Sequence, residues 1–132
     1  MSLIVKTGSA LPPDELMVVN EKVAVGTPLG IGSEIFVWTA ETQGGSGLVA
    51  VGEVEAVGPA DSDRRRSITV RLLSRSPAKG LGKADLVAHD HRVNEGAANT
   101  PVGRLAAKLY GHSLNRVVEL DEDEAHFLRE HF

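Results

Sequence analysis

Two apolar runs near the middle of the chain, residues 32–39 and 47–57, are rich in β-branched and aromatic residues. The segment between them, residues 40–46, contains glycines and small polar residues, which suit a reversing loop. The first run is apolar at successive positions, so both of its faces are expected to be covered. The pattern therefore predicts a β-hairpin near the centre of a sheet.

The second run alternates more clearly than the first. Glu53 and Glu55 fall on the face opposite Val54 and Ala56, so one face of this strand is expected to meet solvent. Gly52 stands in the middle of the run, where side-chain packing is normally needed. A glycine at such a position indicates a bulge or the close approach of another backbone or a ligand.

The pattern predicts three further strands and leaves one other segment undecided between helix and strand. Residues 3–6 form a short apolar run, and residues 67–73 alternate between apolar and polar positions. Residues 115–120 are expected to form the last strand. Residues 14–25 leave two alternatives open, because the acidic start after two prolines favours a helix whereas the valines favour a strand.

Two helices are predicted from their capping residues. Thr100 and Pro101 are typical of a helix start, and Gly111 would end this helix after an apolar stripe. Asp121 begins a C-terminal helix, where its side chain can accept a hydrogen bond from the backbone N–H of Glu124. The clustered acidic residues that follow favour the positive end of the helix dipole.

Length and composition set the expected class of protein. With 132 residues, 42% of them hydrophobic, we predict a single domain spanning residues 1–132. The absence of cysteine excludes disulfides, thiol nucleophiles and thiolate metal sites, and it is typical of a reducing cytoplasm. The chain has no apolar run long enough for a membrane span and no signal-peptide pattern. We therefore expect a soluble, cytoplasmic protein without a membrane partner.

The central strand pair resembles the EVE domain of the PUA-like superfamily. The resemblance begins with Gly32-Ser33 and the run Glu34-Ile35-Phe36-Val37-Trp38. A glycine-rich turn follows, and then the second run, Leu48-Val49-Ala50-Val51-Gly52-Glu53-Val54. It implies an α+β fold, a bent, mostly antiparallel β-barrel with flanking helices. It also implies recognition of nucleic acid, including modified bases held in an aromatic-lined pocket.

Charge is segregated along the chain, although the net charge is -4. Residues 64–92 contain eight basic and two acidic residues, whereas both ends of the chain are acidic. This basic segment starts with Arg64, Arg65 and Arg66, whose planar guanidinium groups match phosphate oxygens. Two interpretations stay open: the three arginines bind phosphate, or they form a solvated loop that offsets nearby aspartates.

Five residues are candidates for ligand binding in this hypothesis. Trp38, the only tryptophan, could stack a base, and Tyr110 could form a pocket wall at the end of its helix. Ser33, Asn115 and Arg116 would supply polar contacts, since asparagine and arginine can bind base edges. The alternatives are that Trp38 lies in the core and that the polar residues form turns.

The preferred hypothesis is a non-enzymatic module without a cofactor or metal, which binds DNA, RNA or a nucleotide-like ligand. A metal-assisted hydrolase is an alternative, because His89 and His91 flank Asp90 with a spacing that places two imidazoles on one strand face. A third ligand is not fixed by the sequence, and no nucleophile elbow is present. A protein-interaction subunit is the remaining alternative.

Overall fold

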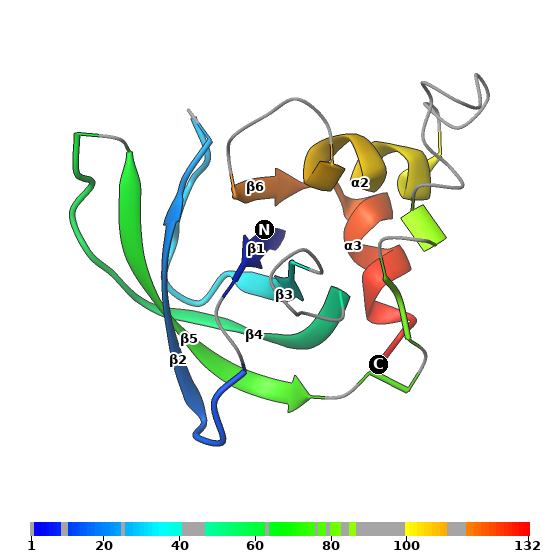
Figure 1. The fold of residues 1–132 in the computed structure, drawn as a ribbon, viewed down its shortest axis with the longest axis horizontal. Coiled ribbons are helices and arrows are strands. Elements are labelled where there is room, and N and C mark those ends of the chain that lie inside the picture. Colours follow the sequence, from blue (N-terminus) through cyan, green and yellow to red (C-terminus); the bar gives the residue numbers. More distant parts are fainter. Residues whose placement is uncertain are drawn as a thin grey trace.

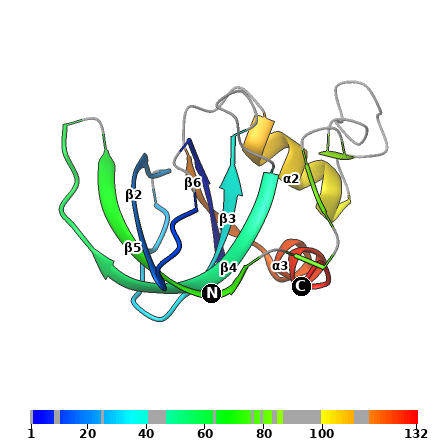
Figure 2. The ribbon, with the colours of Figure 1, turned by 60° about the horizontal axis from the view of Figure 1, so that its bottom comes forward.

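Six strands form one curled sheet, and two helices pack on part of it (Figure 1). These are the elements of the described part of the chain. The computed structural model describes residues 2–8, 11–24, 26–40, 47–62, 64–75, 77–78, 80–82, 85–86, 100–110 and 116–132. Within these residues the sheet is a half-barrel (Figure 2).

The strand order in the sheet is β2-β5-β4-β3-β1-β6. Strands β1 and β3 run parallel, and the other neighbouring pairs run antiparallel. The sheet is therefore mixed, with antiparallel pairs in the majority. The strand bounds are β1 (Ser2–Thr7), β2 (Leu16–Lys22), β3 (Glu34–Thr39), β4 (Gly47–Val57), β5 (Arg65–Arg75) and β6 (Val117–Leu120).

The two outermost strands of the sheet, β2 and β6, meet just past the end of β2. Val23 and Val117 form a parallel bridge, and the backbone N–H of Ala24 donates to the carbonyl of Val117 at 3.0 Å. The N–H of Arg116 donates to the carbonyl of Lys22 at 2.7 Å. This seam brings residues 22–24 beside residues 116–117, although they are far apart in the sequence.

The sheet separates two hydrophobic cores, and β3 contributes to both. Ile35 and Val37 are buried in the core inside the half-barrel, which receives side chains from all six strands. Phe36 and Trp38 are buried on the outer face, in the core beneath the helices. The prediction that this strand is covered on both faces is therefore confirmed.

Gly52 lies at an irregularity of the β4–β5 pairing, as its position in the sequence predicts. The register shifts between Val51 and Gly52. A Cβ atom at this position would overlap the main-chain carbonyl of Arg71 and lie 2.9 Å from the Cγ1 atom of Val70. Only glycine allows the two strands to approach this closely.

Helix α2 (Pro101–Tyr110) and helix α3 (Glu122–Arg129) begin at the predicted caps. The Thr100 hydroxyl accepts a hydrogen bond from the N–H of Gly103 at 3.0 Å. The Asp121 carboxylate accepts from the N–H of Glu124 at 2.8 Å, and the Glu124 carboxylate accepts from the N–H of Asp121 at 2.9 Å. Both helices are thus specified locally, by residues next to their first turns.

The structure decides the open alternative for residues 14–25 in favour of a strand. β2 pairs with β5 along its whole length, from Leu16 opposite Arg71 to Lys22 opposite Arg65. The α+β class is confirmed, and its sheet is a curled, mixed half-barrel. None of the helices in the described ranges is both long and apolar enough to cross a membrane.

Candidate functional site

Trp38 and Tyr110, the two predicted aromatic ligand residues, are in contact. The Trp38 Nε1–H donates to the Tyr110 hydroxyl at 2.7 Å, and the rings meet edge to face with centroids 6.1 Å apart. Trp38 is 0% exposed, so its ring is part of the core and offers no free face to a base. Tyr110 is partly exposed at the end of α2.

Lys6 is a neighbour of this pair that the sequence did not indicate. Its ammonium lies 3.9 Å from the centre of the Tyr110 ring and donates to the main-chain carbonyl of Leu109 at 2.8 Å. A cation at this position binds the negative end of the α2 dipole and the face of the aromatic ring. Lys6 therefore links β1 to the end of α2.

The other predicted residues are distributed differently. Ser33 precedes β3, and its carbonyl accepts from the N–H of Val54 at 2.9 Å. Five strand positions separate it from Trp38, or about 17 Å at the usual rise per residue. Asn115 and the segment His89-Asp90-His91 lie outside the described residues. Among the residues that are described, no three histidine or acidic side chains group together as metal ligands would.

Four described cations are neutralised by carboxylates. Arg71 donates to both oxygens of Glu55 at 3.0 and 2.8 Å. This bidentate contact holds the pKa of the Glu55 carboxyl below its ordinary value and raises the pKa of Arg71. The other three cations form ion pairs too, Arg104 with Asp121 at 3.1 Å, Lys108 with Glu124 at 2.6 Å and Arg129 with Glu34 at 2.9 Å.

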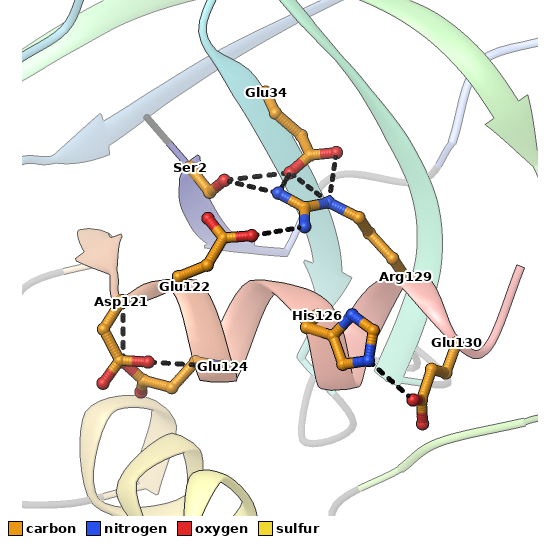
Figure 3. A network of polar contacts seen from close by, with 8 residues as sticks. All are labelled: Ser2, Glu34, Asp121, Glu122, Glu124, His126, Arg129 and Glu130. Carbon is orange, nitrogen blue, oxygen red and sulfur yellow. Dashed lines mark hydrogen bonds and ion pairs between the residues drawn. The ribbon is translucent and has the colours of Figure 1, made fainter.

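The Arg129 contacts fasten helix α3 to the sheet (Figure 3). The guanidinium lies between Glu34 on β3 and Glu122 on the first turn of α3, and the Ser2 hydroxyl donates to the same Glu34 carboxylate at 2.9 Å. The hydrogen bond from Arg129 lowers the pKa of the Glu122 carboxyl. The hydrogen bond to Glu34, and to a smaller extent the one to Glu122, raises the pKa of Arg129. This network is internally satisfied, so we assign it to structure and not to ligand binding.

A second group of cations has no carboxylate partner within the described residues. It lies at one end of the half-barrel, beside the seam, and we call it the basic end. Its members are Lys22, Arg64, Arg65, Arg66 and Arg116. Lys22 is paired in register with Arg65, and the Lys22 carbonyl accepts from the N–H of Arg116. The carbonyl of Arg64 accepts from the N–H of Val23 at 3.2 Å.

Main-chain contacts orient two guanidinium groups of the basic end. The Arg66 Nε–H donates to the carbonyl of Gly58 at 2.9 Å, and an Arg65 N–H donates to the carbonyl of Asn20 at 3.3 Å. The nearby acidic residues are Glu21, in register with Arg66, and Asp61, whose carboxylate accepts from the backbone N–H of Arg65 at 3.0 Å. Positive charge therefore exceeds negative charge among the described residues of this end.

Arg64 has an unusual backbone conformation in the turn that leads into β5. Its φ is 65°, in the left-handed region that normally favours glycine or asparagine. A residue with a Cβ is strained there, and such strain is often kept at functional positions. The turn thus holds a large cation where glycine would be free of this strain.

The structure therefore brings Arg116 to the three predicted phosphate-binding arginines and adds Lys22 to them. Sequence reasoning missed Lys22 because residues 14–25 were ambiguous and only the pairing with β5 decides its place. Lys6 also connects the two sites: its N–H donates to the Arg116 carbonyl at 2.8 Å, and it is in register with Trp38. The aromatic pair and the basic end are thus joined across neighbouring strands.

Comparisons with known proteins add no assignment to this geometry. No family model, curated protein or solved structure matches the chain.

Proposed function

We propose that this protein is a non-enzymatic nucleic-acid-binding module that holds phosphate groups at the basic end. The observation that carries the proposal is the gathering of five cations, from three separate segments, without carboxylate partners in the described residues. Elsewhere, Arg71, Arg104, Lys108 and Arg129 are paired with acids. Lys6 and Arg75 lie apart from one another and bind main-chain carbonyls. Unpaired like charges repel one another, so their retention at one place favours an anionic ligand.

Nucleic-acid phosphates fit the geometry of this end. Arginine presents a planar fork to phosphate oxygens, and Lys22 adds a point charge beside Arg65. The cations lie on neighbouring strands, which are spaced about 4.8 Å apart. A polyanion with regularly repeated charges can bind cations that are spread over several strand positions.

The aromatic pair has a supporting role in this proposal. Because Trp38 is buried and hydrogen-bonded to Tyr110, it positions that ring and does not stack a base itself. Tyr110 and Arg116 are the predicted ligand residues that reach solvent near the seam. The PUA-like, EVE-like assignment belongs to the proposal too, and it is supported by the central strand pair and by the curled sheet.

Binding to a fluorescein-labelled oligonucleotide, followed by anisotropy at several salt concentrations, tests the proposal. Each phosphate contact contributes about 0.7 to 0.9 to the slope of log K against log salt concentration. We expect Arg65→Gln to weaken binding at low salt and to reduce the slope by about this amount. Thermal unfolding of each variant checks that its fold is retained.

Arg104→Gln is the matched control, because Arg104 lies on α2, outside the basic end, and is paired with Asp121. We expect its affinity and salt slope to stay close to those of the unmodified protein. Salt-independent binding, no binding, or equal losses in the two variants would show that the basic end does not bind phosphate.

A further inference from the structure

The outer faces of β2 and β5 form a surface that neither helix covers. The core beneath the helices contains no residue of β2 or β5, and the helices lie on the opposite side of the molecule (Figure 1). Met17 and Val19 on β2, and Ile68 and Val70 on β5, point into the half-barrel. The alternate positions of both strands therefore face solvent, and we call this surface the open ribbon.

One end of the open ribbon is aliphatic. Leu16, Val18 and Leu73 are 45%, 62% and 60% exposed, and they account for three of the four large hydrophobic residues exposed in the described chain. Leu16 is in register with Arg71, so Leu73 is its diagonal neighbour across the strand pair. Single exposed aliphatic residues are common, but a cluster of them marks a contact surface.

The other end of the open ribbon carries two cations of the basic end, Lys22 and Arg65, and a polar stretch connects the two ends. Lys22 and Arg65 are in register, followed by Asn20 opposite Ser67 and then Val18 opposite Thr69. From Lys22 to Leu16 there are six strand positions, or about 20 Å. Bases that lie flat on a sheet are not stacked on one another, so this length holds about three of them, as on other sheet surfaces that bind single strands.

We propose that the ligand of the basic end is a single-stranded nucleic acid that lies along the open ribbon. Its first phosphates bind Lys22 and Arg65 of the basic end. Its following bases lie face down on Val18, Leu16 and Leu73. This inference rests on the proposed function and specifies the ligand class. Only an unpaired strand can turn its apolar base faces toward the protein, because the bases of a duplex are stacked and paired inside it.

The charges around the aliphatic end also disfavour a duplex. Arg71 is bound there by Glu55, and the carboxylate of Glu15 lies 4.0 Å from it. The second backbone of a duplex is separated from the first by a groove of about 12 Å, so it would approach these acids. A single strand with its bases down keeps its phosphates away from them, pointing to solvent.

Anisotropy with one labelled sequence, as a single strand and as a duplex, tests this inference on the full chain. We expect tighter binding of the single strand, with affinity increasing with length up to roughly four to five nucleotides. The variant Val18→Thr/Leu73→Thr places a strand-favouring, β-branched residue at both positions and removes apolar surface. It should lose about tenfold or more in single-strand affinity, with an unchanged salt slope.

Ile31→Thr is the matched control, because Ile31 is 74% exposed but lies outside the ribbon. Its affinity should not change. Equal binding of single strand and duplex, or unchanged affinity of the double variant, would overturn this inference. The proposed phosphate binding would still stand if Arg65→Gln lowers the salt slope. No salt-dependent binding to either form would overturn both proposals. If thermal unfolding shows that the double variant does not fold, Leu73→Thr alone replaces it.

Discussion

The close approach of β4 and β5 at Gly52 leads to a quantitative prediction for Gly52→Ala. The added methyl group would overlap the carbonyl of Arg71 and lie 2.9 Å from a methyl group of the buried Val70. Neither neighbour is the flexible end of a long side chain, so the strands themselves must shift. Overpacking of this kind costs about 1–3 kcal/mol. A weakened ladder hydrogen bond costs about 1 kcal/mol more.

Alanine also restricts the unfolded chain, which offsets this cost by about 0.4–1 kcal/mol. We therefore expect Gly52→Ala to lower the free energy of unfolding by about 1–3.5 kcal/mol. Urea denaturation followed by circular dichroism measures it. With a slope of about 2 kcal/mol per molar for a chain of this size, the midpoint should fall by roughly 0.5 M or more.

Gly58→Ala is the control for this prediction, because Gly58 follows β4 directly and has room for a methyl group. The nearest atom to its added Cβ would be the Cβ of Ser67, at an ordinary 3.4 Å. Its free energy of unfolding, measured in urea, should remain within about 0.5 kcal/mol of that of the unmodified protein. If Gly52→Ala were as stable as Gly58→Ala, the inference that β4 and β5 approach closely at Gly52 would be refuted.

Three further predictions concern single residues. Arg64→Gly relieves a left-handed strain of about 1–2 kcal/mol but adds conformational entropy to the unfolded chain. Urea denaturation should therefore show a gain in stability of about 0.5–1 kcal/mol, while oligonucleotide affinity falls. A loss of stability would contradict the strained turn. Asp121→Ala should cost about 1 kcal/mol and Asp121→Asn much less, because asparagine keeps the cap acceptor. The N–H of Glu124 holds the pKa of Asp121 below its ordinary 3.8, so this stabilisation is present above that value and is lost as the pH falls through the lowered pKa; acid unfolding of Asp121→Asn should lack this part of the pH dependence. Trp38 is fully buried, so its fluorescence should be blue-shifted and resist quenching by acrylamide until the protein unfolds, and strong quenching in the native state would refute its burial.

Local features were the predictable part of the fold. The caps at Thr100 and Asp121 depend on residues within one helical turn, and Gly52 depends on its place inside one strand. Residues 14–25 could not be assigned from the sequence because helix and strand signals compete there. The pairing with β5, some fifty residues later, decides between them.

The candidate site was predictable only in part, for the same reason. Arg64, Arg65 and Arg66 are adjacent in the sequence, so their shared position follows from the chain itself. That Arg116 and Lys22 join them depends on the meeting of β2 and β6, which no local periodicity indicates. Burial of Trp38 follows from the packing of α2 on the sheet, and sequence could only offer it as one of two alternatives.

The seam between β2 and β6 has a consequence for folding and for dynamics. It joins residues 22–24 to residues 116–117 by few hydrogen bonds, so closing it carries the entropy of a long chain loop. Such a junction tends to form late and to open first. A polyanion that bridges Lys22 and Arg116 would hold the two sides of the seam together, so amide exchange around the seam would slow on binding. Ligand affinity and closure of the half-barrel would then be thermodynamically coupled.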